Sequence, residues 1–392
     1  MSVRVWRTGE PREPAFEAAW NATLARAPYA HYALRLDWLE WNATHGTPGI
    51  AVLVEENGIA GVIAARLERG VWVSGLPWRW QAAVASEGRT PSRHIDAPEA
   101  ERLFAALAGA AGRDRVRAYL PVPPARGIPG FLAGKTILHR IDASDEELQR
   151  AMDKTKRSMI RRARRDGYEV VEGTTLDLMR RFAAVQRETD ARHGVAPLDG
   201  PGEIPPPGLR WREWELPWMW LLVAVRSGEV GSGFGFALGS GSVLESRAAA
   251  STRDALRSGA FVLLAFEAAR RARENGYRWL NWGGDTFFKR DVSGALGERV
   301  PIHLWLGGSG PWALANRAEA VLFGARRFVA GLRRGGQDSA AMHEGEPAPP
   351  RAARPASRTE PSVSRDARHG VPAAIAGSLP DLTAGGLSAW AR

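Results

Sequence analysis

Apolar positions recur at regular spacings along the first 335 residues and predict alternating helices and strands. From Phe16 to Leu24 every fourth residue is apolar, which is the spacing of one helix face. Two apolar runs flank Asn57-Gly58, a dipeptide that favours a hairpin turn because both residues tolerate positive φ. The predicted elements of this first series are helices at 16–24, 36–41 and 97–110, and strands at 50–54, 59–67 and 116–120.

A second series of the same kind begins at Ser144. Ser144 and Glu147 have the spacing of a capping box, which predicts a helix that continues to Asp166 and ends at Gly167. The elements predicted after it are helices at 176–192, 261–275 and 311–332, and strands at 168–171, 218–225, 230–238, 242–249, 278–282 and 302–306. Because both series run through helices, a turn-linked meander, a helix and a strand, we expect a duplicated α/β unit.

The fold class expected from this order is α/β (α+β), with two tandem domains and mixed, largely antiparallel sheets. The expected boundaries are 1–143 for the first domain and 144–335 for the second. Residues 336–392 are rich in Pro, Ala, Ser and Gly, and they hold too little apolar surface to offset the entropy cost of ordering. We therefore expect a disordered C-terminal tail.

Composition narrows the class of protein further. The chain has no cysteine, which excludes disulfides, thiolate zinc sites and a cysteine nucleophile. Its eight histidines follow no ligand spacing, so no metal site is expected. The longest apolar run, 218–225, is far shorter than the ~20 residues that span a bilayer, and no apolar stretch follows the N-terminal arginines. The expectation is a cytoplasmic, soluble monomer without a transmembrane segment.

Net charge points to an anionic partner. The chain carries 53 basic and 43 acidic residues, a formal charge of +10, which favours phosphates, nucleotides or RNA. Seven of the twelve residues at 154–165 are basic and none is acidic. Lys154, Arg157, Arg161 and Arg165 share one helix face, a row that suits polyphosphate or an RNA backbone. The alternative is a solvated helix face, although such a face usually intersperses acids among its bases.

A single lysine follows a pair of glycines at the end of a predicted strand. Only four of the 53 basic residues are lysines, and none but Lys289 occurs after residue 156. Gly283 and Gly284 would let a ligand approach the backbone closely. Phe288 is the predicted cation–π partner of Lys289. The alternative is a surface lysine that follows two core phenylalanines.

Tryptophan is abundant, with sixteen in the chain and four of them between Trp211 and Trp220. Aromatic planes can stack on bases or line a groove. Most of these side chains are expected in the core, and Trp211 and Trp214 are the candidates for a substrate-binding groove.

The second series resembles the Fem-type (FemAB-like) aminoacyltransferases and related GNAT-fold acetyltransferase-like proteins. The resemblance rests on the order of a basic run K-x-K-R-x-x-I-R-R-A-R-R-x-G, the strand YEVVEG, the strand pair WLLVAVRSGEVGSGFGFAL, a helix ending in E-N-G-Y, and a strand that leads to G-G and F-F-K. In the first series, 29–41 is similar to the family's opening helix. The resemblance covers about 335 residues and implies two tandem GNAT-like domains.

The resemblance also implies an activity. Fem-type enzymes transfer an aminoacyl group from its tRNA ester to an amine, often on a cell-envelope precursor, without a metal or a covalent enzyme intermediate. By this resemblance Lys289, with Phe288 as its partner, would stabilise the developing oxyanion or a phosphate. Arg157 and Arg161, together with Lys154, would contact substrate phosphates. The chain departs from the family after Lys289, where no compact F-G follows.

Two other functions remain open. Acetyl-CoA enzymes of this fold carry [QR]-x-x-G-x-[GA] at a helix N-terminus, whereas 257–264 contains the single glycine Gly259, which favours aminoacyl-tRNA over acyl-CoA as the co-substrate. The first alternative is an acyl-CoA-dependent N-acetyltransferase of an exopolysaccharide or natural-product pathway. The second is a non-catalytic module that binds an anionic polymer or RNA. Lys289 after its glycine pair favours the enzyme, because a binding module needs no such residue.

Overall fold

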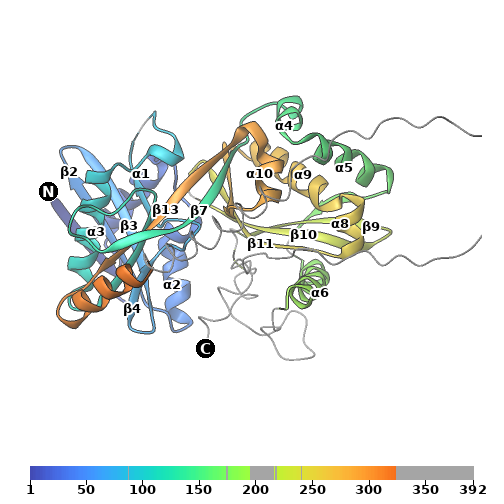
Figure 1. Ribbon diagram of the computed structural model, residues 1–392. Helices are drawn as coiled ribbons and strands as arrows, with labels where there is room; N and C mark the ends of the chain where they lie inside the picture. Colours follow the sequence, from blue (N-terminus) through green and yellow to red (C-terminus); the bar gives the residue numbers. More distant parts are fainter. Residues whose placement is uncertain (87, 174, 195–215, 217–218, 240, 324–392) are drawn as a thin grey trace, which may run out of the picture. The chain divides into compact units, whose positions relative to one another are not determined.

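A computed structural model describes most of the chain up to residue 323 (Figure 1). The described residues are 1–86, 88–173, 175–194, 216, 219–239 and 241–323. The described residues up to 320 form one compact unit, and 321–323 belong to a second. The elements given below belong to the first unit. The expected tail at 336–392 lies outside the described residues, as do Trp211 and Trp214.

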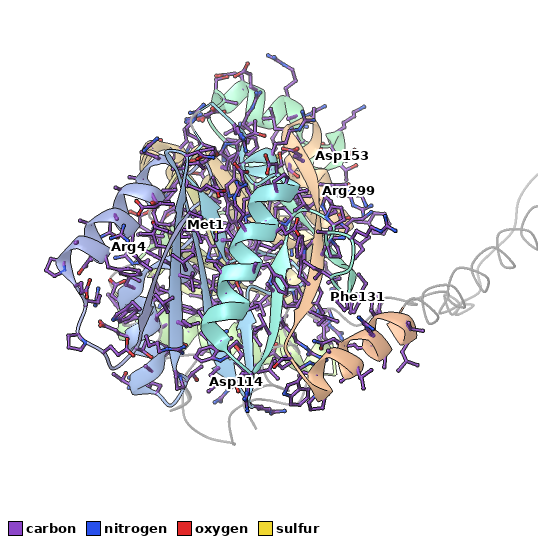
Figure 2. The ribbon with its side chains drawn as sticks, turned by 90° about the vertical axis from the view of Figure 1, so that its left-hand side faces the viewer. Met1, Arg4, Asp114, Phe131, Asp153 and Arg299 are labelled. Atoms are coloured by element: carbon purple, nitrogen blue, oxygen red, sulfur yellow. The ribbon has the colours of Figure 1, made fainter. Side chains whose placement is uncertain are left out.

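The N-terminal half contains the predicted hairpin and helices, with additional strands. Its elements are β1 (Ser2–Arg7), α1 (Pro14–Arg26), the 3₁₀ turn η1 (Tyr32–Leu34), α2 (Leu36–Thr44), β2 (Gly49–Glu56), β3 (Ile59–Glu68), β4 (Val71–Ser74), β5 (Ala82–Val84), α3 (Ala97–Ala111), β6 (Arg115–Leu120) and β7 (Gly130–Arg140). Asn57 and Gly58 adopt φ of 51° and 79°, which confirms the turn between β2 and β3. In Figure 2, α3 lies across these strands and Asp114 lies just beyond its end, where the carboxylate accepts from Trp72 Nε1 at 3.1 Å.

The C-terminal half follows the same scheme. Its elements are α4 (Asp145–Ala151), α5 (Lys154–Arg165), β8 (Glu169–Glu172), α6 (Leu176–Arg192), β9 (Met219–Arg226), β10 (Glu229–Leu238), β11 (Val243–Ser251), α8 (Arg253–Ser258), α9 (Ala260–Glu274), β12 (Trp279–Gly284), α10 (Phe287–Ser293) and β13 (Gly297–Gly307). Residues 311–320 are helical, within the range predicted for the final helix.

The single helix predicted from Ser144 to Asp166 is wrong. The capping box of Ser144 and Glu147 is present, but the helix stops after Ala151 and a new one begins at Lys154. Asp153 starts the second helix, because its carboxylate accepts from the backbone N–H of Thr155 at 2.8 Å. An N-cap carboxylate of this kind satisfies a helix-start donor that has no partner within the helix.

All described strands belong to one mixed sheet, which confirms the predicted α/β class. The order is β1-β2-β3-β4-β6-β13-β7-β12-β11-β10-β9-β8, and β5 pairs with β3. Two pairs run parallel, β4 with β6 and β11 with β12, and the other pairings among the described residues are antiparallel. The last strand, β13, lies between β6 and β7 and so joins elements of both series (Figure 1). The division into 1–143 and 144–335 stays a prediction.

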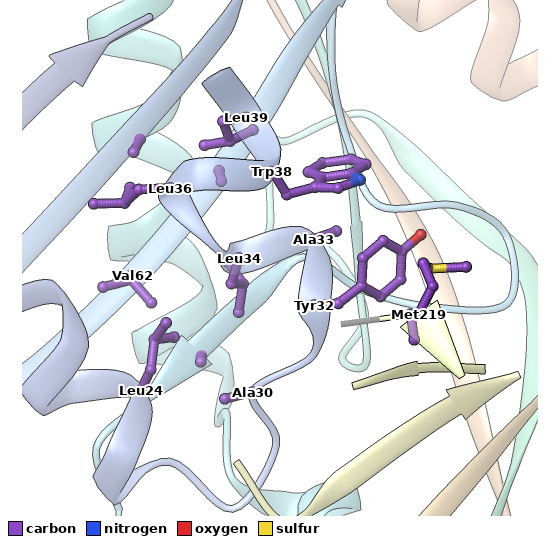
Figure 3. Packing of buried hydrophobic residues seen from close by; sticks show 14 of the residues in the cluster. Leu24, Ala30, Tyr32, Ala33, Leu34, Leu36, Trp38, Leu39, Val62 and Met219 are labelled. Carbon is purple, nitrogen blue, oxygen red and sulfur yellow. The ribbon is translucent and has the colours of Figure 1, made fainter. Parts of the chain in front are cut away.

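Hydrophobic packing also joins the two series. In the C-terminal half, α9 packs over β9 and β10 on one face of the sheet, and α6 packs over β10 and β11 on the other (Figure 1). One buried cluster contains Tyr32 and Trp38 from the N-terminal half together with Met219 from β9, and Figure 3 shows Tyr32 beside Met219. No helix in the described part of the chain is both long and apolar enough to cross a bilayer.

Candidate functional site

Lys289 lies in the first turn of α10, directly after β12. The hydroxyl of Thr286 caps this helix by accepting from the backbone N–H of Lys289 at 3.5 Å. Gly283, in β12, has a φ of 77°, a conformation that residues with a side chain rarely adopt. A Cβ placed at Gly283 would lie 3.8 Å from Lys289 Nζ and 3.5 Å from Trp78 Cδ1. The lysine ammonium and the indole edge therefore converge on a stretch of backbone that carries no side chain.

Phe288 has a different cationic neighbour from the one predicted. Lys156 Nζ lies 5.7 Å from the centroid of the Phe288 ring and 3.4 Å from Asp291 Oδ2. Phe288 packs on Phe261 of α9, with centroids 4.8 Å apart. Consecutive helical residues point about 100° apart, so Phe288 faces α9 while Lys289 faces Gly283. Among the described residues, the cation placed over Phe288 is therefore Lys156.

A buried polar network fixes the backbone at the end of β12. The hydroxyl of Thr136, on β7, lies 2.6 Å from Asn281 Oδ1 and 2.9 Å from the carbonyl oxygen of Gly283. The same Asn281 oxygen accepts from the N–H of Gly283 at 2.8 Å, and its amide donates to the hydroxyl of Tyr29 at 3.0 Å. Because each partner is buried, this network holds the position of Gly283 rigidly.

Trp78 approaches Gly283 from the N-terminal half, at the tip of a tight turn. Leu76 and Arg79 close the turn through two backbone hydrogen bonds of 2.8 and 3.0 Å, which leaves Pro77 and Trp78 at its tip. Pro favours the second position of such a turn because its φ is already set. A side chain at Gly134 of β7 would collide with the carbonyl of Pro77, so the turn packs closely against that strand.

A buried ion pair anchors the turn to the C-terminal half. Arg79 Nη1 lies 2.6 Å from Glu245 Oε1 on β11 and donates to the hydroxyl of Tyr32 at 2.6 Å. Burial opposes the charge of Glu245, but the guanidinium of Arg79 holds the pKa of this carboxyl below its ordinary value. Sequence patterns alone did not identify Trp78, Arg79 or Glu245, because 166 residues separate the two members of the pair.

We expect Glu245→Gln to lower the free energy of unfolding by about 3–5 kcal/mol, the usual cost of removing one partner of a buried ion pair. The amide leaves the guanidinium of Arg79, which is 3% exposed, without its counter-charge. The double variant Arg79→Met/Glu245→Gln should recover most of this loss, because the buried guanidinium of Arg79 is removed together with its counter-charge. Urea unfolding of the three proteins measures the difference; equal stability of Glu245→Gln and wild type would contradict it.

The basic residues of α5 do not form a uniform row. The guanidinium of Arg157 donates to the backbone carbonyls of Arg150 and Met152 at 3.0 and 2.8 Å, so it stabilises the end of α4. Lys154, Arg161 and Arg165 are exposed. The contact with substrate phosphates predicted for Arg157 stays a prediction. In the structure this side chain joins the start of α5 to the end of α4.

The N-terminus of α9 packs closely against α5. Gly259, before α9, has a φ of 87°, and a Cβ placed there would lie 2.5 Å from the carbonyl oxygen of Met159 in α5. The N–H groups of Val262 and Leu263 both donate to the carbonyl of Gly259 at 3.0 Å. The backbone of α5 therefore fills the space on the Cβ side of Gly259, close to the helix start where enzymes of this fold hold a phosphate.

Metal ligands do not gather in the ranges that the structure describes: no group of three or more His, Asp or Glu side chains there could hold an ion.

Comparison with known proteins identifies solved structures with a similar fold. No family model matches the chain, and no curated protein matches it. Among solved structures it is similar to FemX, with a TM-score of 0.52 and 14% identity over 78% of this chain and 97% of that one. A tandem GNAT protein from the clavulanic acid biosynthesis pathway is 14% identical over 79% of this chain and 99% of that one, with a TM-score of 0.39. The chain therefore has the fold of FemX, which confirms the resemblance at the level of fold.

Proposed function

We propose that this chain is a GNAT-fold, FemAB-like N-acyltransferase that forms an amide bond, with Lys289 as its catalytic cation. The observation that carries the proposal is the convergence of Lys289 and Trp78 on the side-chain-free backbone of Gly283. An ammonium group beside backbone that carries no side chain suits a carbonyl that becomes an oxyanion. Phe288 lies on the other side of α10. Its packing on Phe261 fixes the position of the helix that presents Lys289.

The reaction proposed is attack by an amine on an ester carbonyl. The nitrogen–carbon bond forms, the carbonyl oxygen gains negative charge, and the ammonium of Lys289 stabilises that charge. Collapse of the intermediate breaks the carbon–oxygen bond to the donor, and one proton of the amine passes to the departing oxygen. The enzyme itself forms no covalent bond to the acyl group in this scheme.

The donor proposed is aminoacyl-tRNA. Two features support it over acyl-CoA: the filled space beside Gly259 at the start of α9, and the exposed bases Lys154, Arg161 and Arg165 on α5. The acceptor proposed is an amine on a cell-envelope precursor or small molecule, and the setting proposed is cytoplasmic. A screen of charged tRNAs against acyl-CoAs, by single-turnover transfer to amine acceptors, tests the proposal. Transfer from acyl-CoA alone would favour the N-acetyltransferase alternative.

We expect Arg161→Ala/Arg165→Ala to weaken binding of tRNA. The slope of log Kd against log salt concentration should decrease by the amount that corresponds to about two lost phosphate contacts. Both guanidinium groups lie on the exposed face of α5, so their loss should leave the fold intact. Filter binding at several salt concentrations measures the slope. The matched control is Arg93→Ala/Arg113→Ala, which removes two exposed charges from other elements. An unchanged slope in the α5 variant, or an equal loss in the control, would show that α5 is a solvated face.

A further inference from the structure

Resting on the function proposed above, we propose that Trp78 contacts the acyl group held at Lys289 and selects donors whose acyl side chain is large and apolar. Trp78 comes from the N-terminal half, whereas Lys289 and Gly283 belong to the C-terminal half. The site would thus be built from both series of elements, with the catalytic cation supplied by one and the selecting surface by the other.

Proximity is the first argument. Trp78 Cδ1 and Lys289 Nζ both lie within 4 Å of the position that a Cβ of Gly283 would occupy. A carbonyl whose oxygen contacts the ammonium carries its acyl side chain only a few ångströms away. The indole of Trp78 is therefore within reach of that side chain.

The exposure of Trp78 is the second argument, because it sets this residue apart from the core tryptophans. Trp80, two residues along the same strand-turn segment, is fully buried and stacks on Tyr29 with centroids 4.0 Å apart. Trp78 is only partly buried. Part of the Trp78 side chain is therefore accessible to a ligand, which that of Trp80 is not.

Rigidity is the third argument. Arg79, the next residue, is held by Glu245 and Tyr32, as described above. On the same side, Gln81 Nε2 donates to the carbonyl of Ala33 at 2.7 Å, and its side-chain oxygen accepts from the N–H of Gly75 at 3.2 Å. A preorganised surface discriminates between ligands because it cannot relax around the wrong one.

Chemistry gives the class of acyl group. The indole offers apolar area, so a large apolar or aromatic side chain gains from the contact, while glycyl gains nothing. A lysyl or arginyl side chain would meet the like charge of Lys289, which disfavours it. We therefore expect phenylalanyl and leucyl donors to be preferred over glycyl and lysyl donors.

The test compares Trp78→Ala and Trp78→Phe with wild type, using phenylalanyl-tRNA and glycyl-tRNA as donors. We expect Trp78→Ala to lower kcat/KM for the phenylalanyl donor by about 10- to 100-fold and to leave the glycyl donor within a factor of about three. Trp78→Phe should retain most of the preference. The matched control is Trp41→Ala, a partly buried tryptophan on α2 whose ring centroid lies 4.3 Å from that of His45. Circular dichroism melting confirms that each variant is folded. An equal loss for both donors would overturn the selectivity.

A second measurement does not depend on transfer. The chain has four lysines, so acetylation by acetic anhydride can be followed at each by peptide mass spectrometry. The probe is the non-hydrolysable 3′-phenylalanylamido analogue of adenosine, with the glycyl analogue for comparison. We expect the phenylalanyl probe to protect Lys289 but not Lys154 in wild type and Trp41→Ala, and the protection to be lost in Trp78→Ala. Protection that is unchanged in Trp78→Ala, or absent in wild type, would overturn the inference. Trp78-dependent protection without any transfer would instead refute the proposed function alone.

Discussion

Replacing Lys289 with Met should lower the single-turnover rate of acyl transfer by on the order of 100-fold, roughly 3 kcal/mol of transition-state stabilisation. The ammonium interacts more strongly with the oxyanion of the transition state than with the neutral carbonyl of the bound donor, so its loss raises the barrier. Affinity for the donor should change much less than the rate. Rapid-quench transfer with enzyme in excess over charged tRNA separates the two.

The fold should tolerate this substitution. Lys289 is partly buried, and a methionine side chain keeps most of its apolar stem. We expect the melting temperature to stay within a few degrees of that of wild type.

Two further variants sharpen the result. Lys289→Arg should recover only part of the rate, because a planar guanidinium does not occupy the place of a compact ammonium. Lys135→Met removes the same charge from an exposed position of β7, away from the bases proposed to bind tRNA, and serves as the control. Transfer at the wild-type rate by Lys289→Met would remove this residue from the mechanism and with it the main support for an acyltransferase.

Local patterns were sufficient to predict most elements of the fold. The helix predicted at 176–192 has the same bounds as α6, because Thr175 caps its start and a clear apolar face follows. The predicted turn at Asn57-Gly58 is present because its chemistry is contained in two residues. Where a signal lies within a few neighbouring residues, the sequence alone locates it.

The misplaced and missing elements depend on longer-range contacts. The break between α4 and α5 has neither Pro nor Gly at it, and it is stabilised by Arg157, which reaches back to the end of α4. Strand β7 was not predicted, because its first half is Gly-Phe-Leu-Ala-Gly, without alternation. It is paired on both sides, by β12 and β13, and both partners lie more than 130 residues further along the chain.

The candidate site shows the same division. The proximity of Lys289 to Gly283 could be predicted, because six residues separate them and a strand end and one helical turn bring them together. The approach of Trp78 could not, because it requires the pairing of Arg79 with Glu245 across the two halves. Such a pairing depends on the three-dimensional fold, and no local pattern in the sequence indicates it.

Three buried histidines should make the protein unfold cooperatively in mild acid. Burial lowers the pKa of His31 and of His94 to about 4 and that of His139 to about 3, each from an ordinary value of 6.5. In the unfolded chain these imidazoles take up protons near pH 6.5, whereas in the folded chain they stay neutral until about pH 4 or below. Stability is therefore complete above pH 6.5 and falls as the pH decreases.

The expected loss is about 1.4 kcal/mol per pH unit for each histidine, so about 4 kcal/mol per unit for the three together well below pH 6.5. A fall of two pH units then removes roughly 8 kcal/mol, which is comparable to the whole stability of a typical domain. Urea unfolding between pH 7.5 and 4.5 measures the slope. His139→Gln should reduce this slope by the contribution of one titrating group, about 1.4 kcal/mol per pH unit. The glutamine amide oxygen can replace the imidazole nitrogen that lies 3.3 Å from Trp282 Nε1. His193→Gln, at an exposed position, should not change the slope. A stability that is constant from pH 7 to 5 would show that these imidazoles are protonated in the folded protein, and so are not held neutral by burial.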